Sequence, residues 1–383
     1  MTPQPQTNPP GSGTYHQHTG KPQQYEWFLP AEINQPYQWR DPELPRLLEE
    51  GTHLLGQLSA AVEHQPARDG VIRMTMAAEA VDSSRIEDIL CTIEEAILPE
   101  EEIAQKRRLD WHEVQYCIAA QEDTLDSLNK APLTMKLLHR AHEILLQGPR
   151  GEGKQPGMVR TRQNWIGGKH IDKALYVPPH PDALPPLLTD LERFLHNDTL
   201  GLPRLITAGM AHYQFEVIHP YLDGNGRIGR LLIALYLSVK QLLSAPVLPL
   251  SSYFREQRPA YYDALSIARV THNLDAWLRF FLEGIVTTAE QQLQRFDQIQ
   301  KLQEQYAGKT VALGSRADTA ADLLAYLYGQ PIVSVPEVAE LLNVSFPTAN
   351  DLVGDLAELG MLKETTGMER GRLFGLWEYV QVW

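Results

Sequence analysis

The chain has 383 residues, of which 43% are hydrophobic and 21% are charged, as is usual for globular proteins with two or three domains. A formal net charge of −14 argues against extensive binding of nucleic-acid phosphates, so any nucleotide site must be locally basic. The longest strongly apolar stretch, residues 231–239, is too short to span a bilayer, and we expect no membrane helix.

The first 110 residues divide into a polar tail and a helical region. Residues 1–24 are rich in Pro, Gln, Thr and Gly and lack the basic and apolar regions of a secretory signal, which predicts a disordered tail. We expect residues 25–110 to form an N-terminal helical region. The two cysteines, Cys91 and Cys117, indicate neither a disulfide framework nor a zinc site, so we expect a cytoplasmic protein.

The middle of the chain has helical periodicity. From about Pro42 to Gln305, apolar side chains recur at spacings of three and four, as at Ile206, Met210 and Tyr213. The predicted fold is therefore mainly α, with a helical-bundle core over residues 111–306. Residues 164–179 interrupt it, because two short β-prone runs flank a pair of glycines; this pattern predicts a small β-hairpin or flap.

The last part of the chain, residues 307–383, forms a separate predicted unit. Helices are expected at residues 319–328, 336–342 and 345–359, followed by strand-like runs near 362–365 and 372–376. Three helices followed by a β-hairpin indicate an α+β winged-helix domain. The third helix contains acidic residues and neither Lys nor Arg, so the sequence favours a protein-contact or substrate-positioning role over DNA binding.

Residues 219–230, HPYLDGNGRIGR, combine the groups needed for attack on a nucleotide phosphate. Glycines on both sides of Asn225 come directly before an amphipathic helix, so a loop and a helix N-terminus can bind an anion. Arg227 and Arg230 are three residues apart and share a helix face, which places two cations at that site. Asp223 is suited to Mg²⁺, and a neutral His219 can take a proton from an attacking hydroxyl.

The surrounding stretch, HYQFEVIHPYLDGNGRIGRLL at residues 212–232, resembles the signature of the Fic family, with Tyr221 in place of the usual Phe. The resemblance extends from about Arg73 to the C-terminus. It implies a protein adenylyltransferase that moves AMP from ATP to a Tyr, Thr or Ser hydroxyl of a target protein and releases pyrophosphate. In that reading His219 is the general base and Asp223 holds Mg²⁺. The ATP-binding residues are Gly224, Asn225, Gly226, Arg227, Ile228, Gly229, Arg230, Tyr261 and Tyr262.

The flap also resembles a part of that family. Residues 156–168, PGMVRTRQNWIGG, and residues 176–181, YVPPHP, are similar to the hairpin that aligns the extended chain of the target by strand-like pairing. The residues implied in target binding are Ile166, Gly167, Gly168 and Lys169. Tyr261 and Tyr262 resemble a tyrosine pair of the adenosine pocket, although aromatic residues at helical spacing are also typical of a core.

Upstream, residues 77–90 form a predicted helix with Ser83 and Glu87 on one face. This segment resembles the inhibitory helix of many Fic proteins, [S/T]-x-x-x-E-[G/N], with Asp88 where Gly or Asn is usual. The resemblance implies that Glu87 pairs with Arg230 and so occupies the cation that the γ phosphate of ATP needs.

Alternatives to this reading remain open. A winged helix commonly binds DNA, so the chain can instead be a regulator with a Fic-type sensor body. A Fic enzyme can also use another nucleotide donor, or remove AMP with help from Glu87. The implied partners are ATP, a target protein, the chain itself through auto-modification, and a second copy in a homodimer.

Overall fold

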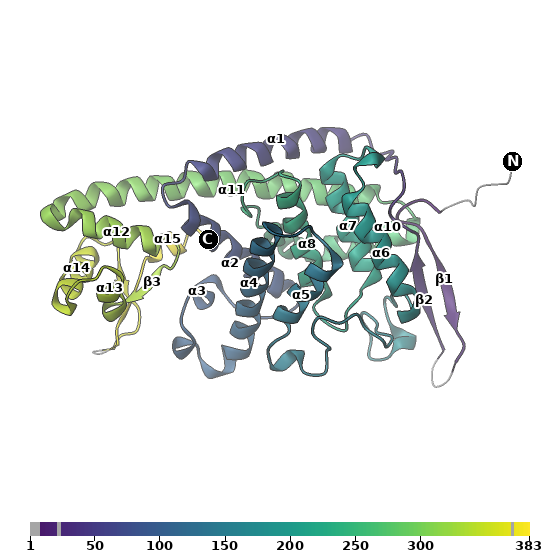
Figure 1. The fold of residues 1–383 in the computed structure, drawn as a ribbon, viewed down its shortest axis with the longest axis horizontal. Coiled ribbons are helices and arrows are strands. Elements are labelled where there is room, and N and C mark those ends of the chain that lie inside the picture. Colours follow the sequence, from purple (N-terminus) through teal and green to yellow (C-terminus); the bar gives the residue numbers. More distant parts are fainter. Residues whose placement is uncertain (1–7, 21–23, 369–370) are drawn as a thin grey trace.

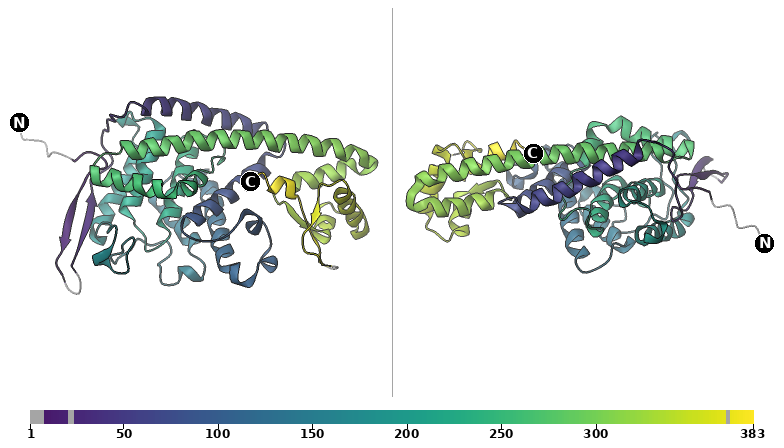
Figure 2. Two further views of the ribbon diagram at one scale, coloured as in Figure 1. Left: turned by 180° about the vertical axis from the view of Figure 1, so that it is seen from behind. Right: turned by 90° about the horizontal axis from the view of Figure 1, so that it is seen from above.

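The computed structural model describes residues 8–20, 24–368 and 371–383. It is an elongated helical body along which one very long helix, α11 (Asp275–Thr310), extends almost from end to end (Figures 1 and 2). The other helices of the body are α1 (Leu44–Glu63), α2 (Arg68–Ile86), α3 (Ile93–Ala96), α4 (Arg108–Leu128), α5 (Met135–Leu145), α6 (Leu184–His196), α7 (Arg204–Ile218), α8 (Asn225–Val239), α9 (Ser251–Glu256) and α10 (Arg258–Thr271). In the described part of the chain, no helix combines the length and apolarity required to cross a bilayer.

Helices α7 and α8 form the centre of the body. They pack against each other, and most residues of both are buried. Helices α6, α11 and α1 cover α7, whereas α2, α4 and α5 cover α8. The predicted mainly α fold is confirmed, and the chain turns between α7 and α8 through the glycine-containing loop that the sequence singled out.

A β-hairpin near the N-terminus is the largest departure from the predicted elements. Strands β1 (Gly13–His18) and β2 (Tyr25–Pro30) pair antiparallel and project from one end of the body (Figure 1). The prediction of a disordered tail is therefore wrong at β1, and the predicted helical region, residues 25–110, begins with a strand, β2; residues 1–7 and 21–23 lie outside the described residues. Cross-strand aromatic pairs stabilise the hairpin: His16 stacks on Trp27, and the ring of Tyr15 contacts the fully buried Phe28.

The flap at residues 164–179 is simpler than the predicted hairpin. Its strand pairing in the structure is one antiparallel bridge, in which the Ile166 N–H donates to the Tyr176 carbonyl at 2.8 Å. A short 3-10 helix, η4 (Ile171–Lys173), fills the loop between them. Gly167 and Gly168 both have positive φ, so the chain bends away from Ile166 before a second pair of residues can align.

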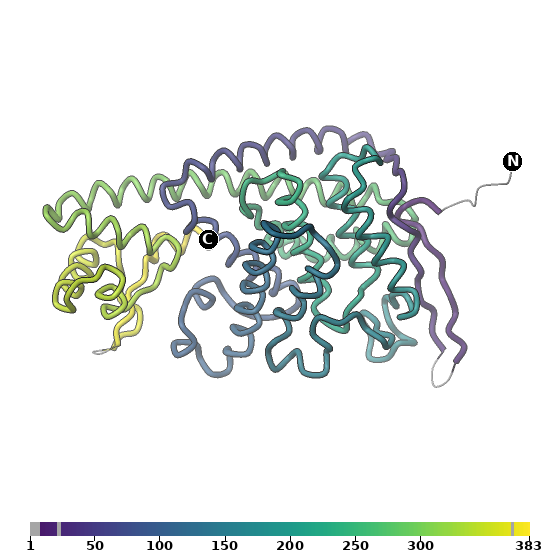
Figure 3. Tube along the Cα trace, viewed as in Figure 1, coloured from purple at the N-terminus to yellow at the C-terminus, as the bar shows by residue number. Residues whose placement is uncertain are grey.

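The C-terminal unit, residues 317–383, lies beneath the far end of α11 (Figure 3). It contains α12 (Ala317–Leu327), β3 (Ile332–Ser334), α13 (Val335–Leu341), α14 (Phe346–Glu358), β4 (Lys363–Glu364), β5 (Leu373–Gly375) and α15 (Trp377–Val380). The strands form an antiparallel sheet in the order β3-β5-β4. The three predicted helices and both strand-like runs are present, and β3 and α15 were not expected. Helix α11 continues four residues past the predicted boundary at residue 306.

Helix α2 meets the C-terminal unit backbone to backbone. A Cβ atom at Gly70 would lie 2.6 Å from the carbonyl carbon of Tyr328 and 2.8 Å from the nitrogen of Gly329. Glycine is therefore the residue that allows this approach. On α1, by contrast, a Cβ atom at Gly56 would meet nothing within 4 Å.

These two glycines give a matched test of the packing. We expect Gly70→Ala to lower the free energy of unfolding by about 1–3 kcal/mol, because the added methyl group forces the two backbones apart. Gly56→Ala should instead raise it by up to about 1 kcal/mol, since alanine favours the helix. Urea denaturation followed by circular dichroism measures both, and equal stability of the Gly70→Ala variant and the wild type would contradict the contact.

Candidate active site

Two residues in left-handed conformation shape the loop between α7 and α8. His219 ends α7 with φ of 50°, and Gly224 begins α8 with φ of 75°. The Asn225 side chain fixes the loop between them, because its Oδ1 accepts from the N–H of Tyr221 at 2.8 Å and its Nδ2 donates to the Tyr221 carbonyl at 2.9 Å. The loop thus places His219, Asp223 and the N-terminus of α8 in one region, where backbone N–H groups favour an anion.

A buried arginine holds His219 in place. Arg160 is 1% exposed, and its guanidinium donates to the carbonyls of His219, at 2.9 Å, and Pro179, at 2.6 Å. Burial lowers the pKa of Arg160 to about 10. Burial and the nearby charge of Arg160 together lower the pKa of His219 to about 4. The imidazole is therefore neutral at neutral pH, as a general base must be.

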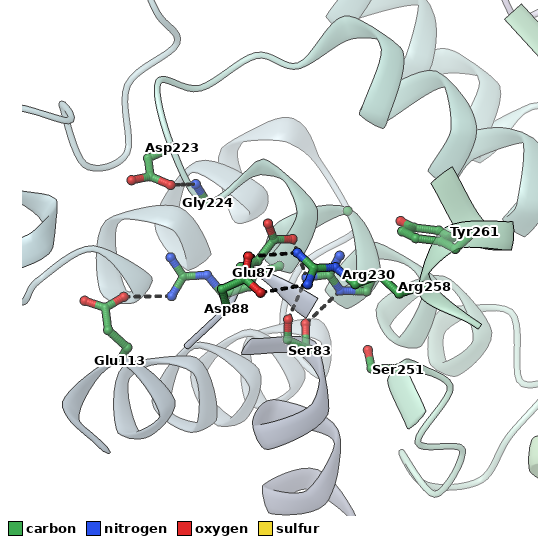
Figure 4. Close-up of polar contacts among 12 residues, drawn as sticks. Ser83, Glu87, Asp88, Glu113, Asp223, Gly224, Arg230, Ser251, Arg258 and Tyr261 are labelled. Atoms are coloured by element: carbon green, nitrogen blue, oxygen red, sulfur yellow. Dashed lines mark hydrogen bonds and ion pairs between the residues drawn. The ribbon is translucent and has the colours of Figure 1, made fainter. Parts of the chain in front are cut away.

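Both arginines of α8 are paired with carboxylates. Arg227 forms a buried ion pair with Glu113 of α4 at 2.8 Å. Arg230 donates to the Ser83 hydroxyl at 2.9 Å, to the Ser83 carbonyl at 2.8 Å and to Oε1 of Glu87 at 2.9 Å (Figure 4). Burial alone would lower the pKa of Arg230, but Glu87, Tyr261 and Glu216 together outweigh burial and raise the pKa above its ordinary value.

The end of α2 explains the unusual Asp88. Glu87 caps the helix, and Asp88 adopts the left-handed conformation with φ of 60°, which Gly, Asn and Asp tolerate best. The Asp88 carboxylate forms two hydrogen bonds to Arg258 of α10, at 2.7 and 2.9 Å. Asp88 thus provides the backbone conformation of the usual Gly or Asn and adds an ion pair, which raises the pKa of Arg258.

Asp223 lies at the outer side of the loop. Its Oδ1 accepts from the N–H of Gly224 at 2.7 Å, and its Oδ2 lies 3.5 Å from the Lys154 ammonium group. The described residues contain no cluster of three or more His, Cys, Asp or Glu side chains that could hold a metal. A single half-exposed carboxylate nevertheless fits Mg²⁺, which often binds one carboxylate together with phosphates and water.

The predicted tyrosine pair is split between core and surface. Tyr261 is 1% exposed, stacks on Phe254 and shares a hydrogen bond with Nε2 of His212, so the structure places it in the core. Tyr262 is 41% exposed and lines a cavity of about 370 Å³ between α7, α10 and the flap. The other residues of this cavity are Ile166, Leu175, Tyr176, Glu216, Val217, Arg258, Leu265, Ser266 and Arg269.

The remaining predicted site residues are three positions of α8 and Lys169 of the flap. Ile228 is buried in the core, and Gly229 is where α8 approaches Glu216: a Cβ atom there would lie 2.2 Å from the Glu216 carboxylate. At Gly226 a Cβ atom would lie 2.3 Å from Glu87, so this glycine leaves room for the carboxylate beside Arg230. Lys169 is exposed on the flap.

Sequence reasoning missed four residues of the site. Glu113 and Arg160 lie on distant segments, and no local pattern marks them as partners of Arg227 and His219. Burial raises the pKa of Glu216 to about 7, and its position three residues before His219 was the available signal. Arg258 directly precedes the sequence PAYY and could have been noticed as a cation beside the tyrosines.

Comparisons with known proteins identify relatives of this chain. The Fic/DOC family model matches residues 132–237, and the Fic/DOC family N-terminal model matches residues 46–126. Protein adenylyltransferase fic-1 of Caenorhabditis elegans is 29% identical over 143 residues, which are 37% of this chain and 25% of that protein. Protein adenylyltransferase Fic of Drosophila ananassae is 34% identical over 113 residues, 29% of this chain and 20% of that protein. The chain thus spans a quarter or less of these relatives.

Solved structures share the fold. A Fic family protein from Desulfovibrio desulfuricans superposes with a TM-score of 0.56 at 21% identity, covering 89% of this chain and 98% of that one. Residues 134–508 of Fic-1 from C. elegans superpose with a TM-score of 0.51 at 19% identity, covering 67% of this chain and 73% of that one.

The lowered histidine pKa values predict acid sensitivity. Burial lowers the pKa of His212 to about 3, and that of His219 is about 4, whereas both are near 6.5 in an unfolded chain. As the pH falls below 6.5, the unfolded chain binds protons that the folded protein does not, so stability decreases. From pH 7 to pH 5, the free energy of unfolding should fall by about 1–2 kcal/mol less in His219→Asn than in the wild type. The variant lacks one of the buried histidines whose pKa is lowered by folding. Guanidinium titrations at both pH values measure this, and an identical pH dependence would contradict the neutral, buried His219.

Proposed function

Because this chain is a member of the Fic/DOC family, we propose that it is a protein adenylyltransferase that moves AMP from ATP to a Tyr, Thr or Ser hydroxyl of a target protein. The observation that carries the proposal is the buried Arg230 on the first turns of α8, which is paired with Glu87. A buried cation near the N-terminus of a helix, preceded by a loop that begins with a neutral histidine, suits a phosphate chain that is attacked by a hydroxyl.

The proposed reaction assigns one task to each group. His219 takes the proton of the target hydroxyl while the hydroxyl oxygen attacks the α phosphorus of ATP. The new phosphorus–oxygen bond forms while the bond to pyrophosphate breaks, so AMP stays on the target and pyrophosphate leaves. The loop amides, Arg227 and Arg230 stabilise charge on the phosphates. Arg227 can do so while remaining paired with Glu113, since one guanidinium has five N–H donors.

Asp223 is the residue proposed to hold Mg²⁺, which neutralises phosphate charge when it is bound. Its carboxylate is half-exposed and adjoins the anion-binding end of α8. The ammonium group of Lys154 faces the same carboxylate, so it must move away or contact Asp223 together with the metal when Mg²⁺ binds.

The proposed resting state is inhibited by α2. Glu87 contacts the guanidinium that we assign to the γ phosphate, and a carboxylate and a phosphate cannot both occupy that place. The Asp88–Arg258 pair adds a second attachment between α2 and α10, next to the Tyr262 side of the cavity. The resemblance to the Fic family also allows Glu87 a role in the reverse process, in which it orients a water for removal of AMP.

The flap is the proposed docking edge for the target. Trp165, Ile166 and Leu175 expose apolar side chains beside the cavity, and Leu175 is 81% exposed. An extended segment of the target can pair with the flap backbone while its hydroxyl side chain points toward His219. Apolar neighbours of the modified residue would pack against these three side chains.

Substitutions at Glu87 and His219 test activity and inhibition. Glu87→Gly frees Arg230, so we expect incorporation of labelled AMP, on the chain itself or on a lysate protein, to rise by about tenfold or more. Adding His219→Ala should abolish the signal, because the general base is lost. Mass spectrometry identifies the transferred group. No rise in the Glu87→Gly protein, or an added mass other than AMP, would contradict the proposal.

A milder substitution at Asp88 also tests the proposed inhibition by Glu87. Asp88→Asn retains a residue that tolerates the left-handed conformation but removes the charge that binds Arg258. We expect AMP labelling to rise by a few-fold, less than in Glu87→Gly, because Glu87 still contacts Arg230. Asp69→Asn, an exposed acidic residue at the other end of α2, is the control and should leave labelling unchanged.

A further inference from the structure

His142 connects the Asp223 loop to a second loop of the site. It lies on α5 and is 0% exposed. Its Nδ1 accepts from the N–H of Gly157 at 2.9 Å, so this nitrogen carries no proton. The proton is therefore on Nε2, which donates to the carbonyl of Asp223 at 3.0 Å. One neutral imidazole thus uses both nitrogens, each on a different loop.

Ring stacking fixes the plane of this imidazole. The ring of Tyr221 lies parallel to it, with 3.8 Å between centroids and 8° between planes. The Tyr221 hydroxyl reaches Nδ1 of His139, one turn away on α5, at 2.8 Å. Tyrosine at this position, where the family usually has phenylalanine, therefore adds a second attachment of the loop to α5.

The residues that His142 connects adjoin the proposed metal position. Asp223 supplies the carboxylate, and its own carbonyl is the group that His142 holds. Gly157 ends a loop whose Lys154 reaches the same carboxylate at 3.5 Å. His142 therefore holds two segments: the backbone of Asp223 and the loop that contains Lys154.

We propose that His142 is a positioning residue that aims the Asp223 carboxylate at the metal of a bound nucleotide by holding the Asp223 carbonyl and the Gly157 N–H together. The inference rests on the proposed function, in which Asp223 binds Mg²⁺ with ATP. It assigns the effect to the two hydrogen bonds, not to the volume of the ring. Residues that orient a metal ligand typically change metal affinity when they are replaced.

Two substitutions separate the hydrogen bonds from the packing. His142→Phe keeps an aromatic ring on Tyr221 and loses both hydrogen bonds. His142→Gln loses the stack but has an acceptor for Gly157 and a donor for Asp223. His139→Phe is the matched control, because it makes the same change one turn away and removes only the partner of the Tyr221 hydroxyl.

The experiment measures binding of α,β-methylene ATP, which cannot transfer AMP, to full-length protein carrying Glu87→Gly. Calorimetric titrations are made with Mg²⁺ and with EDTA. We expect His142→Phe to weaken the Mg²⁺-containing complex by about tenfold and to leave metal-free binding within about twofold. His142→Gln and His139→Phe should keep the Mg²⁺ dependence of the parent protein, even where thermal denaturation shows a lower Tm.

The outcomes separate this inference from the proposed function. Equal weakening of metal-free and Mg²⁺-containing binding in His142→Phe, or the same loss of Mg²⁺ dependence in His139→Phe, would show that packing alone matters and would overturn the positioning role. If the expected pattern appears but the Glu87→Gly protein transfers no AMP, the positioning role stands and the proposed transfer is wrong. If Glu87→Gly is active and His142→Phe binds Mg²⁺ as the parent does, the transfer stands and the positioning role is wrong.

Discussion

Arg230 carries a buried positive charge, and the carboxylate of Glu87 compensates it. This ion pair links the end of α2 to α8, because the guanidinium of Arg230 on α8 donates to both Ser83 and Glu87. Removing the carboxylate without a substitute would leave a desolvated charge. Under the proposed function, ATP binding therefore means that the γ phosphate replaces the Glu87 carboxylate at Arg230.

The local parts of this arrangement could be read from the sequence. The 219–230 motif indicated a loop before a helix, and the four-residue spacing of Ser83 and Glu87 put them on one face, as the structure describes. The contacts that fix the parts could not be read. Glu113 and Arg160 are more than 50 residues from their partners in the loop, and their burial among carbonyls and charges depends on the packing of α4 and the segment before the flap.

Composition misled the prediction at the N-terminus. Residues 1–24 have the Pro, Gln and Gly content of a disordered segment, but in β1 the neighbouring rings of Tyr15 and His16 pair with Phe28 and Trp27 across the hairpin. The backbone N–H of Phe28 also donates to the carbonyl of Val177 in the flap, a contact that no local pattern predicts. The flap shows the opposite error: two β-prone runs were visible, but the left-handed glycines between them limit the pairing to one bridge.

The backbone contact at Gly70 has a mechanical meaning. Helix α2 is 19 residues long, or about 28 Å at the usual rise, and its two ends have different neighbours. One end is pressed against Tyr328 and Gly329 of the C-terminal unit, and the other end presents Glu87 to Arg230. A helix is stiff over this length, so α2 acts as a strut. The C-terminal unit is therefore rigidly connected, through one helix, to the ion pair of Glu87 and Arg230.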